Sequence, residues 1–131
     1  MDFKNANELL ALCEEKNLPV SEIMRIREIE LGETAADIVN KKMTRVLEIM
    51  KDAAFSPIKQ PVKSMGGLIG GEARKLSLHA QNNEGLCGDL LQKAITYAMA
   101  TLETNASMGL IVASPTAGSA GIVPGLVLAM Q

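Results

Sequence analysis

Residues 103–125 read Glu-Thr-Asn-Ala-Ser-Met-Gly-Leu-Ile-Val-Ala-Ser-Pro-Thr-Ala-Gly-Ser-Ala-Gly-Ile-Val-Pro-Gly. This stretch predicts a loop of small residues between two apolar helices. Pro124 suits the first turn of the second helix, because a proline lacks the N–H group that would have no partner there. The loop therefore leads into a helix N-terminus, which carries about half a positive charge.

The same loop is a candidate binding site for a small anion. Thr116, Gly118, Ser119 and Gly121 leave backbone N–H groups accessible and supply two hydroxyl groups. The candidate substrate-binding residues of the loop are Thr116, Ala117, Gly118 and Ser119. A site of this kind, free of cationic side chains, suits a small carboxylate. The alternative is a tight connection in which small residues merely fit between two helices, and both interpretations remain open at this point.

Charge is concentrated toward the other end of the chain. Of the 28 charged residues (13 Lys+Arg and 15 Asp+Glu), 21 lie in residues 1–63, and none follows Glu103. The net charge of −2 gives no electrostatic footprint for nucleic acid or for an anionic membrane. Three aromatic residues cannot form a stacking platform for single-stranded nucleic acid. We therefore expect no nucleic-acid partner and no membrane partner.

The uncharged tail from 104 to 131 is long enough to raise the question of a membrane span, which takes about 20 apolar residues. The polar loop interrupts it, and its longest apolar run, 121–130, is too short to span. We expect the tail to be buried in the complete assembly and to expose an apolar patch in the isolated chain. Because this apolar segment stops abruptly at Gln131, we expect a fragment, or half of a core that another polypeptide completes. No secretory signal is recognised, which favours the cytoplasm.

Residues 1–54 are predicted to form charged amphipathic helices. The first covers residues 6–16. The second begins at Ser21 as its N-cap and ends before Gly32 as the C′ residue. Thr34 is the expected N-cap of a third helix. Five apolar residues at 4-3-4-3 spacing give that helix a seam for ordinary core packing against another helix: Val39, Met43, Val46, Met50 and Ala53.

Residues 55–88 are predicted to form a connection rich in proline and glycine. Two prolines between Phe55 and Lys63 are expected to prevent a continuous helix. The segment Gly66-Gly67-Leu68-Ile69-Gly70-Gly71 could cradle an anion, let two backbones approach closely, or provide flexibility. It lacks the spacing of a phosphate-binding loop. A turn is predicted at 82–85.

Residues 89–131 are predicted to form apolar helices joined by the small-residue loop. The first of these is a long helix from about Asp89 to Met108. No convincing strand is predicted, since Leu110–Ala113 is the only β-like run and is four residues long. The expected fold is all-α, an incomplete part of a larger α-helical domain.

Few side chains outside the loop are candidates for chemistry. Cys13 and Cys87 lie too far apart in sequence for a metal-binding pair and are expected to be thiols without a disulfide. His79 is the only histidine, and we expect an exposed surface residue in preference to a catalytic base. Tyr97 is expected in the core or in a subunit contact.

The run Glu103–Gly109, followed by Ala113-Ser114-Pro115-Thr116-Ala117-Gly118-Ser119-Ala120-Gly121, closely resembles the α chain of iron–sulfur-dependent L-serine dehydratase (L-serine ammonia-lyase). The resemblance continues upstream in the same order, through the segments that begin at Asn7, Ser21, Gly66 and Gly88. It covers essentially the whole chain. The Pro-Thr-Ala-Gly-Ser-Ala-Gly run is its most specific part.

This resemblance implies chemistry by a [4Fe–4S] cluster in the complete enzyme. One iron without a cysteine ligand acts as Lewis acid on the serine hydroxyl while a base, not identified here, removes the α-proton. Loss of water gives aminoacrylate, which hydrolyses to pyruvate and ammonia. The implied partners are L-serine, a β chain or domain and the remaining α portion, in an oligomer. The shared motif places Asn105 where it can brace the loop or touch the substrate amino group.

The chain also departs from the family. The family's cluster cysteines lie further along the α chain than this sequence extends, and neither Cys13 nor Cys87 matches a ligand position. Two cysteines cannot supply three cluster ligands. We therefore expect no cluster or metal on this chain alone, and no activity from it alone. The alternatives are a related iron–sulfur lyase acting on another β-substituted amino acid, and a non-catalytic helical interaction module or remnant.

Overall fold

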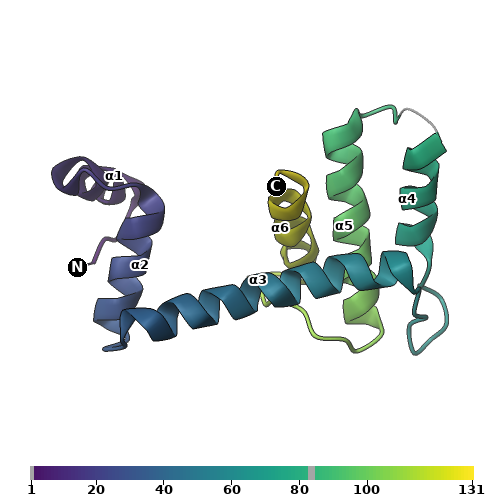
Figure 1. Ribbon diagram of the computed structural model, residues 1–131, viewed down its shortest axis with the longest axis horizontal. Helices are drawn as coiled ribbons and strands as arrows, with labels where there is room; N and C mark the ends of the chain where they lie inside the picture. The colour runs from purple at the N-terminus through teal and green to yellow at the C-terminus, as the bar shows by residue number, and fades with distance from the viewer. Residues whose placement is uncertain (1, 83–84) are drawn as a thin grey trace. The chain divides into compact units, whose positions relative to one another are not determined.

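The computed structural model describes residues 2–82 and 85–131, and over these residues it contains six α-helices and no strand (Figure 1). The all-α prediction is therefore confirmed. Asn83 and Glu84, in the predicted turn, lie outside the described residues. Within them, no helix combines the length and hydropathy needed to cross a membrane. The helices are α1 (Ala6–Lys16), α2 (Val20–Leu31), α3 (Ala36–Lys59), α4 (Glu72–Asn82), α5 (Asp89–Ala106) and α6 (Ala117–Ala129).

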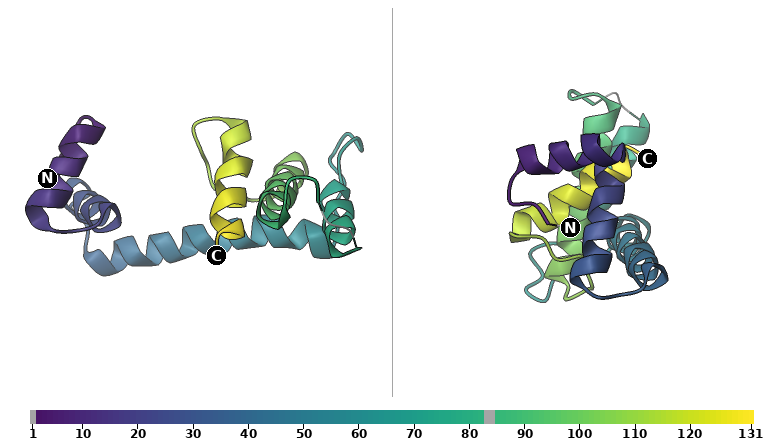
Figure 2. Two further views of the ribbon diagram at one scale, coloured as in Figure 1. Left: turned by 90° about the horizontal axis from the view of Figure 1, so that it is seen from above. Right: turned by 90° about the vertical axis from the view of Figure 1, so that its left-hand side faces the viewer.

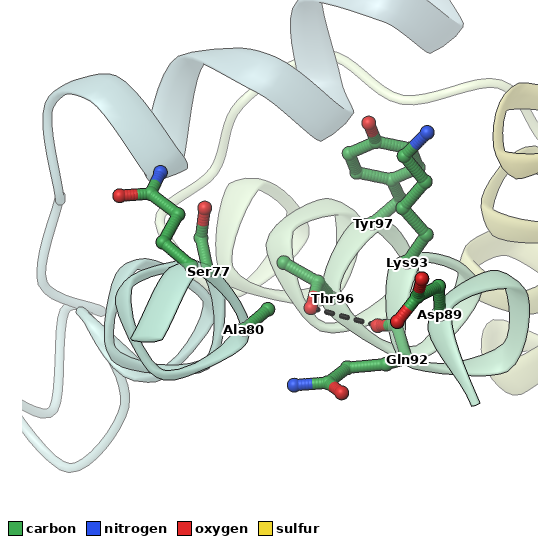
Figure 3. A pocket seen from close by; sticks show the side chains of 8 residues that line it. Ser77, Ala80, Asp89, Gln92, Lys93, Thr96 and Tyr97 are labelled. Atoms are coloured by element: carbon green, nitrogen blue, oxygen red, sulfur yellow. Dashed lines mark hydrogen bonds between the residues drawn. The ribbon is translucent and has the colours of Figure 1, made fainter. Parts of the chain in front are cut away.

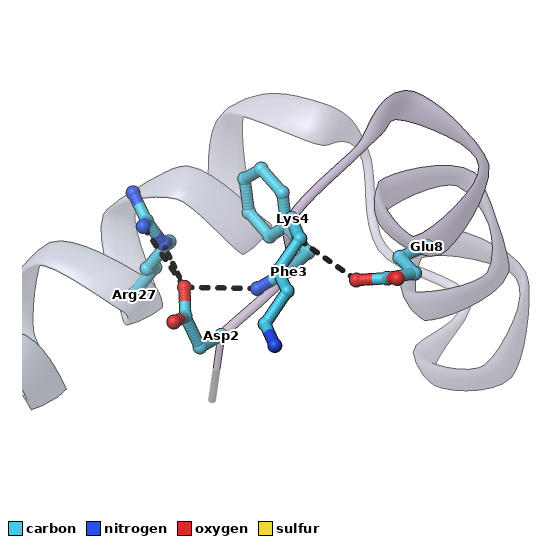
Figure 4. Close-up of polar contacts among 5 residues, drawn as sticks. All are labelled: Asp2, Phe3, Lys4, Glu8 and Arg27. Carbon is cyan, nitrogen blue, oxygen red and sulfur yellow. Dashed lines mark hydrogen bonds and ion pairs between the residues drawn. The ribbon is translucent and has the colours of Figure 1, made fainter.

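The chain divides into an N-terminal unit, residues 1–45, and a C-terminal unit, residues 46–131. In the N-terminal unit α1 packs against α2. The segment before α1 is tied to α2 by Arg27, which pairs with Asp2 at 2.9 Å and lies 4.8 Å from the centre of the Phe3 ring (Figure 4). The Arg27 guanidinium also lowers the pKa of the Asp2 carboxyl. These contacts fasten the residues before α1 to α2, and all of them lie within the N-terminal unit.

Three capping predictions in this unit are wrong. Helix α2 begins one residue before Ser21 because the Pro19 carbonyl already accepts the first helical hydrogen bonds. At its C-terminal end Gly32 has right-handed φ of −85°, and Glu33 takes the left-handed conformation with φ of 45°. The Thr34 hydroxyl donates back to the Gly32 carbonyl at 2.6 Å. Helix α3 begins after Ala35, whose carbonyl accepts its first hydrogen bonds, so Thr34 is not the N-cap.

In the C-terminal unit α5 is the central helix, with α4 on one side and α6 on the other (Figures 1 and 2). These three helices alternate in direction. As a result the N-terminal ends of α4 and α6 and the C-terminal end of α5 lie at one end of the unit, next to the last part of α3 (Figure 1). The two segments that resembled family motifs, 66–71 and 103–121, therefore converge at this end.

Helix α3 does not end before Phe55 as its prolines had predicted. It runs through Pro57 to Lys59. A proline inside a helix removes the donor for the carbonyl four residues earlier, here that of Ala53, which is 2% exposed. The Thr104 hydroxyl of α5 donates to this carbonyl at 2.8 Å. A hydroxyl from another helix thus replaces the lost backbone donor, and this replacement lets α3 continue.

Aromatic packing reinforces the same contact between α3 and α5. The rings of Phe55 and Tyr97 meet edge to face, with centroids 5.2 Å apart and planes at 74°. Tyr97 is half-buried in this contact, and which of its two expected roles it has, core or subunit contact, stays a prediction. The seam predicted along α3 is confirmed only in part, since Val39 and Ala53 are buried but Met43 is 65% exposed.

Helix α6 packs on α5 through glycines. A Cβ atom added at Gly125 would lie 2.7 Å from the Ala94 carbonyl oxygen, and one added at Gly121 would lie 3.1 Å from that of Ala98. The two backbones therefore approach too closely for larger residues. The expectation that Pro124 belongs to the first turn is wrong, because α6 begins at Ala117 and Pro124 lies inside it, fully buried.

We predict that Thr104→Val destabilises the chain by about 1–3 kcal/mol, because it leaves the buried Ala53 carbonyl without a donor. Thr44→Val is the matched control, since the Thr44 hydroxyl bonds an exposed carbonyl, that of Asn40, in the same helix. It should change the free energy of unfolding in urea by less than about 0.5 kcal/mol. In a Pro57→Ala background the loss from Thr104→Val should shrink, since the alanine N–H can serve Ala53. An equal loss in both backgrounds would contradict this explanation.

Candidate functional site

The small-residue loop ends in a closed capping box at the start of α6. The Thr116 Oγ1 accepts from the Ser119 N–H at 3.1 Å, and the Ser119 Oγ accepts from the Thr116 N–H at 3.0 Å. The two hydroxyl oxygens also lie 3.0 Å apart, and the Ser119 hydroxyl donates to the Thr116 carbonyl at 2.8 Å. Both hydroxyls that the sequence offered to an anion therefore have a structural role in starting α6.

Two backbone donors remain at this helix end. By helix geometry the N–H groups of Ala117 and Gly118 have no acceptor within α6. Both residues are exposed, and a Cβ added at Gly118 would meet nothing within 4 Å. The first turn of α6, which is fully described, carries no acidic side chain. The N-terminus of α6 is thus open and electrostatically favourable to a small anion.

Asn105 lies in the last turn of α5, one residue before its end, and is exposed. Its carbonyl accepts from the Met108 N–H at 3.0 Å, in a turn where Met108 has φ of 64°. The hydroxyls of Thr116 and Ser119 bond to each other and to their own backbone, not to the Asn105 amide. Asn105 therefore lies at the end of α5 from which the loop leaves, and its role toward the loop or the substrate stays a prediction.

The glycine segment owes its composition to backbone conformation. Gly67, Gly70 and Gly71 have φ of 70°, 144° and 99°, which L side chains rarely adopt. A Cβ added at Gly70 would also lie 2.5 Å from the Val62 carbonyl oxygen. Ser64 closes the turn, because its N–H donates to the Ile69 carbonyl at 2.8 Å. Of the three interpretations offered by the sequence, close approach of two backbones is confirmed.

Carboxylates of the chain itself occupy N–H groups at the end of this segment and just after it. The Glu103 carboxylate of α5 accepts from the Ala73 N–H at 2.7 Å and from the Gly71 N–H at 3.1 Å. Glu103 is 2% exposed. The Glu72 carboxylate accepts from the Gly70 N–H at 2.7 Å. The sequence analysis missed this role, although Glu103 is the last charged residue of the chain and lies in an apolar helix.

The remaining candidate side chains lie apart from the loop. His79 is exposed on α4, as predicted. An open hollow of about 380 Å³ lies between α4 and α5, and its α5 residues, 89–97, belong to the half of α5 farther from the loop (Figure 3). Its lining is mostly polar: Ser77, Ala80, Gln81, Asp89, Gln92, Lys93, Thr96 and Tyr97. None of the predicted loop residues lines it.

The cysteines do not form a metal centre. Cys13 is half-buried on α1 in the N-terminal unit, and Cys87 is exposed before α5 in the C-terminal unit. Both are free thiols. Among residues 2–82 and 85–131, no group of three His, Cys, Asp or Glu side chains could hold a metal ion.

We predict that Glu103→Gln destabilises the chain by about 1.5–3 kcal/mol. The substitution removes the charge and replaces one acceptor oxygen with an NH₂ group that faces a backbone donor. Asp52→Asn, an exposed acid-to-amide change in the same unit, is the control and should stay within about 0.5 kcal/mol. Urea unfolding of the three chains is the measurement. If all three chains are equally stable, the Glu103 carboxylate does not stabilise the fold.

A second prediction concerns how the stability of the chain depends on pH. The N–H groups of Glu72 and Gly70 bond the Glu72 carboxylate and hold its pKa below the ordinary value of 4.5. Its contribution to stability is therefore fully present above that ordinary pKa and is lost as the pH falls through the lowered pKa of the folded chain. The difference in Tm between the unmodified chain and Glu72→Gln should be largest near neutral pH and vanish in acid. A difference that does not change with pH would contradict the assignment.

Comparison with known proteins identifies the family. Residues 15–131 match the family model described as "Serine dehydratase alpha chain". The chain is 39% identical to the probable L-serine dehydratase α chain of Bacillus subtilis over 129 residues, which cover 98% of this chain and 43% of that protein. It is 34% identical to the L-serine dehydratase α chain of Peptoniphilus asaccharolyticus over 127 residues, 97% of this chain and 44% of that one.

The same region matches longer relatives. The L-serine dehydratase of Helicobacter pylori is 30% identical over 129 residues, 97% of this chain and 28% of that protein. No solved structure matches. The chain therefore spans less than half the length of the relatives named above. Since the family model covers nearly all of it, the chain belongs to the serine dehydratase alpha chain family.

Proposed function

We propose that this chain is part of an L-serine ammonia-lyase, which converts L-serine to pyruvate and ammonia. The observation that supports this most directly is the family match over residues 15–131, which includes the whole small-residue loop. In the proposed reaction serine loses its α-proton and its hydroxyl as water. The resulting aminoacrylate takes up water and releases ammonia, so pyruvate is the final product.

Within this enzyme we assign the serine carboxylate to the N-terminus of α6. The N–H groups of Ala117 and Gly118 are free to donate, and the helix dipole favours a negative charge there. A hydroxyl hydrogen can rotate, so Thr116 can turn its O–H to the carboxylate while its oxygen still accepts from the Ser119 N–H. Ser119 can do the same, at the expense of its bond to the Thr116 carbonyl.

Asn105 is assigned to the substrate amino group. Its amide oxygen can accept from an ammonium group, and the residue is exposed in the last turn of α5, next to the start of the loop. No residue of this chain is assigned as the catalytic base. His79, the only histidine, lies on α4 outside the loop.

The [4Fe–4S] cluster implied by the resemblance does not fit the residues of this chain. Such clusters are held by cysteine thiolates. The two cysteines belong to different units, and the described residues form no three-donor group. We therefore assign the cluster to a part of the complete enzyme outside these 131 residues. On this proposal the isolated chain is inactive, and the complete enzyme contains a β chain or domain and the rest of the α chain.

The test is Gly118→Ala in an enzyme assembled from this chain, the part of the Bacillus subtilis α chain outside the matched region, and the β chain. The alanine Cβ has room at Gly118, so folding should be unaffected, but it narrows access to the N–H groups. Weakening hydrogen bonds to a charged group by about 1.5–3 kcal/mol lowers kcat/KM for serine roughly ten- to hundredfold.

Gly66→Ala is the matched control, since Gly66 also has open space around a Cβ and no positive φ. It should leave kcat/KM unchanged. Both variants should keep the Tm and the iron content of the unmodified enzyme. If Gly118→Ala is as active as Gly66→Ala, the carboxylate does not bind at the N-terminus of α6.

A further inference from the structure

Helix α6 is apolar on every side, and only one side is covered. Apart from Ser119, every residue from Ala117 to Ala129 is apolar. The side that faces α5 buries Ala120, Gly121, Pro124, Gly125, Leu128 and Ala129. The opposite side, which we call the outer face of α6, consists of Ile122, Val123, Leu126, Val127 and Met130.

The outer face is substantially exposed. Ile122, Leu126 and Met130 are 56%, 47% and 75% exposed and recur at intervals of four residues, so they form one stripe. Val123 and Val127 widen it and are 42% and 43% exposed. A helix that is hydrophobic all round is normally buried on all sides. A contiguous apolar surface of this kind marks an interaction site.

We propose that the outer face of α6 is the surface on which the remaining part of a serine dehydratase α chain packs, through an apolar, uncharged helical segment. The inference rests on the partner named in the proposed function, but it requires no catalytic activity. In the Bacillus subtilis and Peptoniphilus asaccharolyticus relatives, the matched region makes up 43% and 44% of the α chain. More than half of each of these α chains is therefore polypeptide outside the matched region.

The chemistry of the face agrees with this occupant. No charged residue follows Glu103, so the surface offers nothing to pair with a charged partner. Its aliphatic and Met side chains provide ridges that suit another apolar helix. In the relatives the additional segment belongs to the same polypeptide, so its effective concentration near α6 is high. A second copy of the chain is a separate molecule and does not have this advantage.

The experiment co-expresses this full chain, carrying an affinity tag, with an untagged probe. The probe is the part of the Bacillus subtilis α chain outside the matched region. The variant Leu126→Glu places a charge at the centre of the outer face. Leu78→Glu is the matched control, because Leu78 on α4 is 48% exposed against 47% for Leu126. Circular dichroism and Tm verify that all three chains fold alike.

The unmodified chain and Leu78→Glu should retain the probe, and Leu126→Glu should retain at least tenfold less. In the unmodified complex, carbene footprinting should show lower labelling of Ile122 and Leu126 than in the free chain. This second measurement tests the proposal even if Leu126→Glu fails to fold. A complex that forms but shows no lyase activity after addition of the β chain would contradict the proposed function and leave this surface intact.

Three results would overturn the proposal. The first is equal retention of the probe by Leu126→Glu and the unmodified chain. The second is unchanged footprinting of the outer face in the complex. The third is failure of the probe to bind while sedimentation shows a dimer of the unmodified chain that Leu126→Glu dissociates, because the occupant would then be a second copy.

Discussion

The buried carboxylate of Glu103 is the constraint on which the C-terminal unit depends. Burial of a carboxylate is costly unless hydrogen bonds compensate for its lost hydration. Here the N–H groups of Gly71 and Ala73 do so, at the N-terminus of α4, where the helix dipole also favours a negative charge. The carboxylate can keep these bonds only if the start of α4 stays against the last turns of α5. The positive φ values of the glycine segment allow the chain to reach that position.

The neighbours of Glu103 extend this arrangement to the other helices. Thr104 supplies the donor that lets α3 continue through Pro57, and its carbonyl accepts from the Gly109 N–H at 2.8 Å, which turns the chain out of α5. Asn105 is left exposed at the point where that turn begins. Three consecutive residues thus have three different roles: one holds α4, one holds α3, and one is free for the proposed substrate. Two of these three residues, although they lie in a run that is similar to a family of enzymes, therefore serve to hold helices together in this chain.

The sequence predicted the fold class, α1 and most of α5, because the periodicity of these helices depends on neighbouring residues. Apart from the local caps of α2 and α3, it failed where the deciding partner is distant. Pro57 predicted the end of α3, because the donor that replaces its missing N–H comes from Thr104, 51 residues after the acceptor Ala53. The glycine segment was one candidate for binding an external anion, because its own residues do not indicate that the Glu103 carboxylate, 32 residues after Gly71, accepts from the Gly71 N–H. At the candidate site the predicted loop included residues 117–121, but these form the start of α6, and Thr116 and Ser119 close a capping box there.

The most direct measurement of the central claim is amide hydrogen exchange by NMR on the unmodified chain. If the Glu103 carboxylate holds the start of α4, the amides of Gly71 and Ala73 should be among the slowest to exchange in the C-terminal unit. The amides of Ala117 and Gly118 at the open N-terminus of α6 provide the internal reference and should exchange rapidly. Exchange of Gly71 and Ala73 as fast as that of Ala117 and Gly118 would show that Glu103 does not hold them, and would contradict the account.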